Sequence, residues 1–374
     1  MVTKLGGTTL AEPAREDARP VTATATRTRR DDAPVTVSGE VDGGDWDAFL
    51  DRHPDATVEH LWGWRDVFQR AFRHDCVYLA ARRHGGVVGV LPLVRYRSAI
   101  FGRFLVSLPY FNYAGIVADD AEVAGALVAH AEDLGREHGA KHVELRHRDR
   151  LPLKLPYSQG KVGVARELPA TADDLWKTID RKVRNQVRKA QKEELTTTNG
   201  GVALIDDFYS VFAQNMRDLG TPVFPKSLFV ETARTFPDTA RFFVVRQGDR
   251  PVAGGVSLRF RGTVLVPWAS SLREARHLCP NMLLYWSMME WAVGQGCGVF
   301  DFGRSSVGAG TQQFKEQWGG VARPLHTEYI LLNGGSVPNQ GTSNPRMQMA
   351  INVWRRLPLR VASLLGPRLI AHLA

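Results

Sequence analysis

One order of predicted elements occurs twice in this chain of 374 residues. In the first half, two helices precede a hairpin across Gly85-Gly86; a strand, a helix ending at Gly139 and a strand at His142–Arg146 follow. In the second half the hairpin turns at Gly248-Asp249 and the last strand covers Val299–Phe302. The spacing between matching elements is nearly constant, which indicates a duplicated fold. We therefore predict an α+β fold of two tandem units, each a mixed, mostly antiparallel sheet flanked by helices.

Composition sets the limits of the two units. Residues 1–40 contain no aromatic residue, and six basic residues balance six acidic ones, so this arm is predicted to be disordered. We expect a first unit over residues 41–160 and a second unit, with the active site, over residues 161–332. The tail, residues 333–374, is basic and amphipathic, with five arginines and no acidic residue. It could rest on an anionic membrane surface or pack back on the domain.

Charge and cysteine content narrow the functional classes. The net charge of +9 favours anionic partners such as phosphates, acidic glycans, RNA or a membrane surface, and we do not expect DNA among them. Three widely spaced cysteines argue against a disulfide framework and are typical of a reducing cytoplasm. The histidines lack ligand spacing, so no metal is expected. No apolar run could span a bilayer and the amino terminus lacks a signal pattern, so we expect a cytoplasmic protein, or one peripheral at the inner face of the membrane.

The stretch Cys297–Gly320 has the pattern of a functional site. A short buried strand at Val299–Phe302 runs directly into Gly303-Arg304-Ser305-Ser306, and a glycine-rich turn and the segment Phe314–Gly319 follow. Polar and cationic groups placed after a buried strand are typical of a site at the carboxyl edge of a sheet. The alternative is a plain loop in which the glycines only turn the chain.

Three common motifs are excluded in this stretch. Gly303 to Gly308 has phosphate-loop spacing, but Ala309-Gly310 stands where Lys-Ser/Thr is required. The nucleophile elbow lacks its last glycine, and no G-x-G-x-x-G opens a helix. The sequence therefore predicts neither an NTPase of this type, nor a serine hydrolase, nor a Rossmann enzyme.

Several segments, together with the doubled order of elements, resemble the FemAB family of aminoacyl transferases. The match is closest to the FemAB-like proteins associated with XrtA (exosortase)/PEP-CTERM exopolysaccharide systems, and it covers roughly residues 41–332. The segments are Leu108–Tyr113, His142–His147, Asn215–Pro222, Pro267–Ser271, Pro280–Trp286, Phe300–Ser305 and Phe314-Lys315. The resemblance implies two acetyltransferase-like (GNAT) units and transfer of an acyl or aminoacyl group onto an amine. The expected co-substrate is aminoacyl-tRNA or acyl-CoA, with no tightly bound cofactor.

The turn that binds pyrophosphate in CoA-dependent members of this fold departs from the pattern. It reads Arg276-His277-Leu278-Cys279-Pro280-Asn281, without glycine. A close backbone approach to a pyrophosphate is therefore not expected, which argues against CoA as donor. Asn281 and the first amides of the following helix could still bind an anion.

Lys315 and Asp301 are the catalytic candidates. Acyl transfer passes through an oxyanion that needs a fixed donor, worth about 3–4 kcal/mol. The resemblance places Lys315, in the Phe-Lys motif, at the donor end of the site; the alternative is a strand lysine that extends into water. Asp301 could accept a proton from the attacking amine or pair with a neighbouring arginine. Arg304 and Ser305 could bind a donor phosphate or an acceptor carboxylate, with a surface salt bridge of Arg304 as the alternative.

Other residues are candidates for substrate binding. In the segment Arg181–Lys192, one helical stripe carries Arg181, Arg184 and Arg188, and it could receive an anionic donor or be a solvated basic face. Candidates for an acceptor pocket are Asn215, Arg217, Asp218 and Thr221, with Trp268, Ser270, Ser271 and Tyr285 on the opposite wall. The two aromatic residues of that wall could equally be core residues. Tyr110, Asn112 and Tyr113 interrupt a predicted strand over residues 105–117; they could contact the acceptor, and the alternative, which we favour, is structural packing.

These observations predict a transferase that forms an amide on an amino group of a cell-envelope or exopolysaccharide precursor, a glycan or a lipid-linked molecule. One alternative is an acyl-CoA-dependent N-acyltransferase acting on an amino sugar. Another is a non-catalytic protein of the same fold that binds an anionic glycan.

Overall fold

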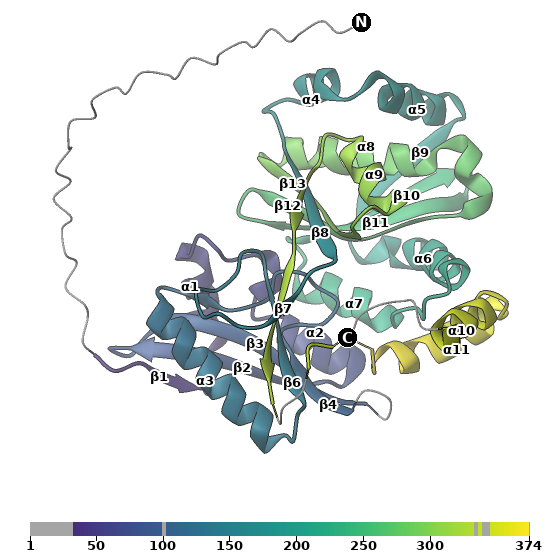
Figure 1. Cartoon of the computed structure of the whole chain (residues 1–374). Helices are drawn as coiled ribbons and strands as arrows, with labels where there is room; N and C mark the ends of the chain where they lie inside the picture. The colour runs from purple at the N-terminus through teal and green to yellow at the C-terminus, as the bar shows by residue number, and fades with distance from the viewer. Residues whose placement is uncertain (1–32, 99–101, 333–335, 339–344, 374) are drawn as a thin grey trace, which may run out of the picture. The chain divides into compact units, whose positions relative to one another are not determined.

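Two sheets carry the described part of the chain, and each contains one copy of the repeated order (Figure 1). The computed structural model describes residues 33–98, 102–332, 336–338 and 345–373. The first sheet has the spatial order β1 (Thr36–Ser38), β2 (Asp75–Arg83), β3 (Gly86–Ser98), β4 (Gly102–Val106), β6 (His142–His147), β15 (His326–Leu331) and β7 (Tyr157–Ser158), with β5 (Val117–Ala118) paired to β3. The second has the order β14 (Val321–Pro324), β8 (Lys161–Glu167), β13 (Val299–Ser306), β12 (Thr263–Ser271), β11 (Arg250–Phe260), β10 (Ala240–Gln247) and β9 (Leu195–Gly200).

The strand pairing repeats between the sheets. In each sheet the two strands that flank a crossover helix are parallel, as such a connection requires, and the other described pairs are antiparallel. The crossover helix is α3 (Ala121–Glu137) between β4 and β6, and α8 (Pro280–Gly294) between β12 and β13. Both predicted hairpins are present as β2–β3 and β10–β11. The predicted α+β fold of two tandem units is thus confirmed.

The remaining helices cover the faces of the sheets. They are α1 (Gly43–Arg52), η1 (Val58–His60), α2 (Trp64–Phe72), α4 (Ala172–Thr178), α5 (Arg181–Lys192), η2 (Val202–Leu204), α6 (Ile205–Leu219), α7 (Lys226–Thr235), η3 (Arg273–Leu278), α9 (Gly310–Glu316), α10 (Pro345–Arg355) and α11 (Leu359–Ile370). Helix α8 is buried on nearly every side, against the second sheet and under α4 and α5. A helix without a polar face belongs inside a domain, so α8 is the central element of the second unit.

One hydrophobic core joins the two units. It contains residues of α1 and α2 from the first unit and of α6, α7 and β12 from the second. The ring of Phe111 lies 4.6 Å from Trp64 and 5.6 Å from Trp268, measured between centroids, so it contacts both units. Because all three side chains are buried, the units are packed as one body at this interface.

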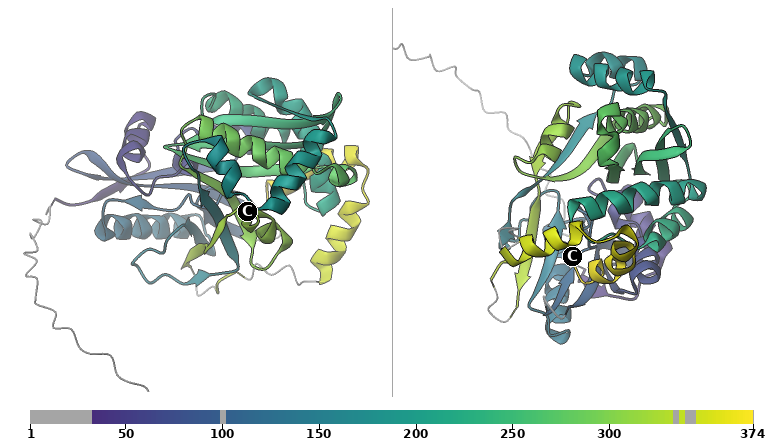
Figure 2. Two further views of the ribbon diagram at one scale, coloured as in Figure 1. Left: turned by 90° about the horizontal axis from the view of Figure 1, so that it is seen from above. Right: turned by 90° about the vertical axis from the view of Figure 1, so that its right-hand side faces the viewer.

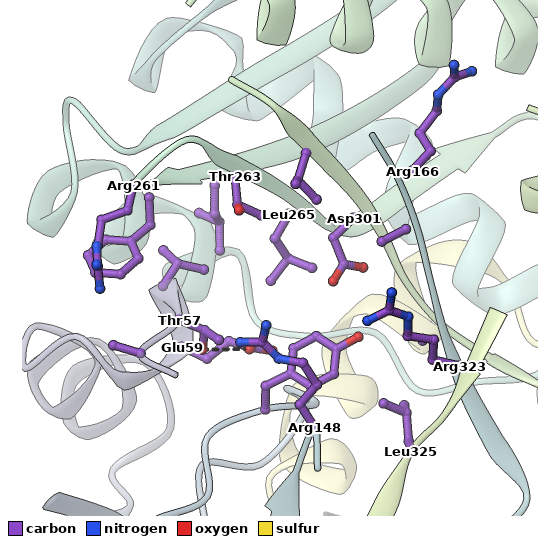
Figure 3. Close-up of a pocket in the computed structure, with 18 of the residues that line it drawn as sticks. Thr57, Glu59, Arg148, Arg166, Arg261, Thr263, Leu265, Asp301, Arg323 and Leu325 are labelled. Carbon is purple, nitrogen blue, oxygen red and sulfur yellow. Dashed lines mark hydrogen bonds between the residues drawn. The ribbon is translucent and has the colours of Figure 1, made fainter. Parts of the chain in front are cut away.

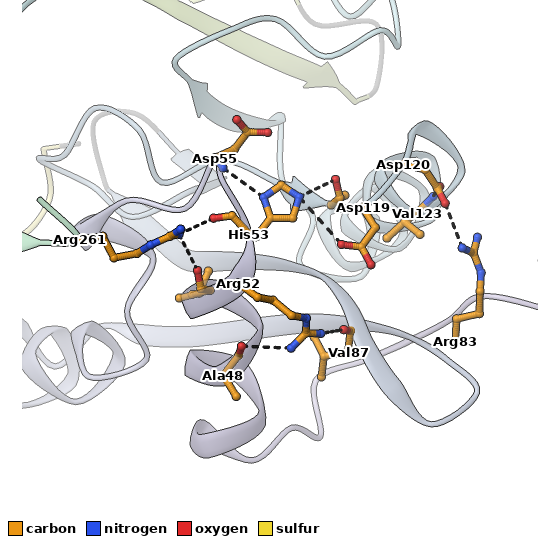
Figure 4. Close-up of polar contacts among 12 residues, drawn as sticks. Ala48, Arg52, His53, Asp55, Arg83, Val87, Asp119, Asp120, Val123 and Arg261 are labelled. Carbon is orange, nitrogen blue, oxygen red and sulfur yellow. Dashed lines mark hydrogen bonds and ion pairs between the residues drawn. The ribbon is translucent and has the colours of Figure 1, made fainter. Parts of the chain in front are cut away.

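A polar contact fixes the segment that follows α1. Arg261, in the turn between β11 and β12, donates hydrogen bonds to the carbonyl oxygens of Leu50 and His53 at 3.1 and 2.6 Å (Figure 4). The His53 ring in turn lies 3.2 Å from the carbonyl oxygen of Ala118. The turn of the second sheet therefore satisfies the end of α1 and positions residues 54–60 beside the second unit.

The order of β15 corrects the predicted unit boundary. Residues 326–331 were expected in the second unit, but β15 pairs with β6 and β7 of the first sheet. His147 and Glu328 secure this pairing, with 2.9 Å between the imidazole and the carboxylate. The segment assigned to the second unit thus contributes a strand to the sheet of the first. Local periodicity could not predict this pairing, because it shows which residues form a strand and not which strand they pair with.

Other predicted boundaries also change. Thr36–Ser38 pairs with β2, so the predicted arm cannot extend to residue 40; residues 1–32 lie outside the described residues. The strand predicted over 105–117 ends at Val106, because the backbone turns at Leu108 and Tyr110, both with positive φ. Helices α4 and α5 are separate, and the Asp180 carboxylate between them caps the start of α5 at 2.7 Å from the Lys182 amide.

Phe111→Ala should destabilise the whole molecule, because the lost ring contacts both units. We expect the free energy of unfolding to fall by about 3–5 kcal/mol, measured by denaturant titration. The exposed Val202→Ala variant is the control and should change it by about 0.5 kcal/mol or less. Two separate transitions, of which only one shifts, would show that the units do not share one cooperative core.

Candidate active site

Strands β12 and β13 of the second sheet separate beside Asp301, which leaves an opening in the sheet. Strands β12 and β13 pair in parallel only from Thr263 with Val299 to Leu265 with Asp301, and their described pairing stops there. At the same place β13 bulges against β8, where Asp301 faces Ala165 and Arg304 faces Gly163. The extra residue places Asp301 and Arg304 on one face of the sheet, toward the first unit. Gly303 permits the bulge, because its φ is +72°.

A cavity of about 660 Å³ lies under this opening, between the units (Figure 3). We call it the junction cavity. Its charged lining residues are Glu59, Arg148, Arg166, Glu167, Arg261, Asp301 and Arg323, and the hydroxyl-bearing residues are Thr57, Tyr113 and Thr263. Figure 3 shows the Asp301 carboxylate pointing into the space that the guanidinium groups of Arg148 and Arg323 also approach. The cavity thus combines inner carboxylates with a cationic rim.

Two buried carboxylates face this cavity from different units. Glu59 of η1 is fully buried; it accepts hydrogen bonds from the Asn112 amide at 2.9 Å and the Thr57 hydroxyl at 3.0 Å. Burial, with a contribution from Asp301, raises the pKa of Glu59 to about 7. Asp301 is 9% exposed and accepts a hydrogen bond from the Gly303 amide at 2.7 Å. Burial raises the pKa of Asp301 as well, although less is left of this effect because hydrogen bonds and nearby cations lower the pKa.

Tyr113 completes this group. Its hydroxyl hydrogen-bonds to Asp301, which partly offsets the effect of burial on the Asp301 pKa. Gly163 of β8 leaves room for the ring, because a Cβ at that position would collide with the hydroxyl. The packing role expected for Tyr113 is therefore incomplete: the residue also lines the cavity and contacts the predicted catalytic carboxylate.

Lys315 lies behind the bulge. It belongs to helix α9 and is 7% exposed, so the alternative of a strand lysine in water is wrong. Its Nζ donates to the carbonyl oxygens of Gly303 and Arg304 at 3.0 and 2.7 Å. Burial lowers its pKa to about 8, although nearby Asp301 raises it. An ammonium has three N–H donors, so one remains beyond these two bonds. Lys315 is not among the residues that line the junction cavity.

Arg304 and Ser305 lie on opposite faces of β13. Arg304 stands in a recess open to solvent, where desolvation and neighbouring Arg146 lower its pKa to about 10. Arg146 is itself buried and paired with Glu144 at 2.8 Å. Ser305 is 4% exposed and, within the described part of the chain, its Oγ has no hydrogen-bond partner. A buried hydroxyl of this kind is available to a ligand.

The predicted acceptor residues fall elsewhere. The Asn215 side-chain amide donates a hydrogen bond to the Ser270 hydroxyl at 2.9 Å, so one residue from each predicted wall of the acceptor pocket is in contact with the other. Arg217 instead pairs with Asp218 at 2.7 Å and donates to the carbonyl oxygen of Leu357 in the tail at 3.1 Å. The remaining predicted residues are placed as follows: Thr221 after α6, Ser271 at the end of β12, Trp268 in the shared core, Tyr285 against Phe302 and Phe314, and Asn281 in the first turn of α8. None of them lines the junction cavity.

The predicted basic stripe lies on α5. Val183, Val187 and Ala190 are buried against α8, whereas Arg181 and Arg188 are exposed and Arg184 is half-buried. The helix is therefore amphipathic as expected, with its cations on the solvent side. Among the described residues, no group of three histidine, cysteine or acidic side chains is arranged to hold a metal.

The turn before α8 is formed without glycine. Cys279 has a φ of +59°, a left-handed conformation that glycine usually supplies, and Pro280 opens the helix. The chain thus makes a tight turn here although the turn contains no glycine. The amides of Met282 and Leu283 bond back to the Cys279 carbonyl oxygen, at 3.0 and 3.4 Å.

Sequence reasoning missed Glu59, Arg148 and Arg323 as residues of the site. Glu59 lies in a short segment with no glycine-rich turn or preceding strand, and only the long-range contact with the second unit brings it to Asp301. Arg148 directly follows β6 in the first unit. A cationic residue placed right after a buried strand is the signal that could have identified Arg148.

Comparisons with known proteins agree with this architecture. Residues 178–316 match the family model described as an acetyltransferase (GNAT) domain. The structure resembles that of FemX, with a TM-score of 0.62 and 15% sequence identity over 80% of this chain and 98% of that one. It also resembles a tandem GNAT protein from the clavulanic acid biosynthesis pathway (TM-score 0.52, 13% identity, 81% of this chain and 100% of that one).

A further similar structure is the C-terminal domain of a putative lysylphosphatidylglycerol synthetase from Agrobacterium fabrum, with a TM-score of 0.53 and 13% identity over 79% of this chain and 93% of that one. No curated protein matches the chain in a sequence search. At these identities the structural likeness shows the fold alone. The chain has the tandem GNAT fold, and part of its second unit matches the GNAT domain model.

Proposed function

We propose that this protein transfers an acyl or aminoacyl group onto an amine bound in the junction cavity. The observation that carries the proposal is the pair of buried carboxylates, Glu59 and Asp301, at the point where β12 and β13 part. At neutral pH an amine is protonated to an ammonium, and it must lose a proton before its nitrogen can attack. Carboxylates with raised pKa values are suited both to bind the ammonium and to accept that proton.

The transfer is a direct attack without a covalent enzyme intermediate. The acceptor nitrogen forms a bond to the donor carbonyl carbon while Asp301 takes the proton, and the carbon–oxygen or carbon–sulfur bond to the carrier then breaks. We place the donor carbonyl at the opening between β12 and β13, on the side opposite the junction cavity, where the remaining N–H of Lys315 stabilises the oxyanion. The carrier leaves as an alcohol or thiol after it receives a proton.

The cationic rim indicates an acceptor with anionic groups. Arg148, Arg166 and Arg323 line the cavity together with Arg261, and arginine binds phosphates and carboxylates through paired hydrogen bonds. We propose a cell-envelope or exopolysaccharide precursor, carried on a phosphate-bearing glycan or lipid, as in XrtA/PEP-CTERM systems. The similarity to FemX and to a lysylphosphatidylglycerol synthetase supports an envelope substrate. The reaction would take place in the cytoplasm, where both kinds of donor are made.

Two donors are consistent with the site. Aminoacyl-tRNA is favoured by the exposed cations of α5 and by the resemblance to aminoacyl transferases. Acyl-CoA is the second candidate, favoured by the match of residues 178–316 to an acetyltransferase domain. The experiment that separates them incubates the protein with each donor and a panel of amino sugars and amino-terminal peptides, and detects the amide product by mass spectrometry. Failure of every donor and acceptor, with folded protein, would contradict the proposal.

Asp301→Asn should reduce kcat/KM by about 10²- to 10⁴-fold, because the amide cannot accept the proton of the amine. The fold should persist, since the asparagine side-chain oxygen can still accept the hydrogen bond from Gly303. Glu167→Gln, on the exposed rim of the same cavity, is the matched control and should leave the rate nearly unchanged. Equal rates for Asp301→Asn and Glu167→Gln would remove Asp301 from the mechanism.

The rate should show a bell-shaped dependence on pH. Glu59, with a pKa of about 7, must be ionised to help bind and deprotonate the amine, so activity rises as pH increases through 7. Lys315, with a pKa of about 8, must be charged to stabilise the oxyanion, so activity falls as pH increases through 8. Glu59→Gln should abolish the acidic limb, and Lys315→Arg should move the alkaline limb to higher pH. A profile that neither variant alters would exclude these two groups as its source.

If aminoacyl-tRNA is the donor, its binding should weaken steeply with salt. Replacing Arg181, Arg184 and Arg188 with alanine removes up to three phosphate contacts, so the slope of log affinity against log salt concentration should fall by about two. A triple alanine variant at Arg103, Arg136 and Arg234, all exposed and outside α5, is the control for net charge. Donor binding that does not respond to salt would favour acyl-CoA instead.

A further inference from the structure

The tail helices are docked on the molecule through one face. Ala362, Gly366 and Ile370 of α11 are buried, and a Cβ at Gly366 would lie 2.7 Å from the Val223 amide nitrogen. The Tyr110 hydroxyl donates to the Ile370 carbonyl oxygen at 2.7 Å, which fixes the end of α11. The tail therefore packs back on the domain, as one of the two predicted alternatives held. Figure 2 shows α10 and α11 on the outside of the molecule, with their other face uncovered.

The uncovered face is apolar. Of the eleven large apolar side chains that are clearly exposed among the described residues, six lie on α10 and α11. They are Met349, Val353, Val361, Leu364, Leu365 and Leu369, and Met349 and Leu364 are 67% and 64% exposed. Exposed apolar side chains gathered on one element mark a surface that meets an apolar partner.

The tail is also strongly cationic. Arg355, Arg360 and Arg368 are exposed on these helices and Arg356 is exposed between them, and the sequence contains no acidic residue after Glu328. A basic helix pair with exposed leucines is the pattern of a segment that lies in a membrane interface. No helix among the described residues is long and apolar enough to cross a bilayer.

An arginine-rich cavity adjoins the end of α11. Its volume is about 950 Å³, and its lining includes Arg70, Arg73, Arg95, Arg97 and Arg368, with Asp75 as the acidic residue. Asp75 pairs with Arg95 at 3.1 Å, and Arg70 pairs with Asp66 and Glu231. In the described part of the chain, Arg73, Arg97 and Arg368 have no carboxylate partner. Three exposed arginines without a carboxylate partner around one cavity form a site suited to an anion, and arginine suits phosphate in particular.

We propose that this face docks on an anionic phospholipid membrane. The leucines and Met349 enter the lipid boundary, and the arginine cavity receives a headgroup phosphate. A bilayer is the partner that supplies both an apolar layer and a dense layer of anions, whereas a second copy of this face would bring cations against cations. The inference rests on the tail and this cavity, and it does not depend on the proposed transfer reaction.

The test is flotation of the full-length protein with vesicles of phosphatidylcholine alone or with 30 mol% phosphatidylglycerol, a composition near that of anionic membranes. We expect binding to the anionic vesicles only, with affinity that falls as salt increases. Leu364→Glu/Leu369→Glu should abolish binding, and Arg97→Glu/Arg368→Glu should weaken it by roughly tenfold or more. The controls, Val202→Glu and Arg136→Glu, make the same chemical changes on exposed surface elsewhere and should bind as the original protein does.

Four results would overturn the proposal. Binding that neither double variant reduces would place the membrane contact elsewhere. No binding to anionic vesicles by the folded protein would exclude a bilayer as partner. A dimer in sedimentation that becomes a monomer in the Leu364→Glu/Leu369→Glu variant, without lipid binding by the original protein, would make this face a self-interface. If free inorganic phosphate raises the thermal stability of the protein as much as the vesicles do, the cavity is a site for a soluble anion.

Discussion

The candidate site depends on the hydrophobic core that the two units share. Glu59 belongs to the first unit and Asp301 to the second, so their proximity requires that the units do not move independently. The rings of Trp64, Phe111 and Trp268 form that connection, and Arg261 adds two hydrogen bonds to the end of α1. Two carboxylates held close together in a buried place repel each other when both are ionised. Packing elsewhere in the core must supply the free energy that keeps them there.

The surroundings of the two carboxylates differ, and this separates their roles. Asp301 has Lys315 behind it and accepts hydrogen bonds from Gly303 and Tyr113, and each of these favours the ionised form. For Glu59, hydrogen bonds offset less of the effect of burial. Its pKa of about 7 leaves it partly protonated at neutral pH. Since the two groups interact, they titrate as a pair. When both carboxylates are ionised, the pair can bind a cationic amine and then take its proton.

Much of the fold could be predicted from the sequence because its signals are local. Alternating apolar residues and glycine turns gave both hairpins, and the order of elements revealed the duplication. Asp301 and Arg304 were identified because polar groups lie in and after a buried strand there, whereas the bulge itself was not predicted. Glu59 was not identified, because what brings it to Asp301 is the packing of one unit on the other. The same reason explains β15, whose pairing with β6 joins residues far apart in the chain.

Helix α6 connects the site with the tail. Asn215 donates to Ser270 of β12, beside the opening of the second sheet, and Arg217, two residues later, holds the Leu357 carbonyl of the tail. Residues that the family resemblance assigned to the acceptor pocket thus lie between the opening and the surface proposed to meet lipid. The role of Arg217 is then positional: it sets how α10 and α11 lie on the domain that carries the site. If the acceptor is lipid-linked, a tail fixed in this way would hold the junction cavity at a constant orientation to the membrane.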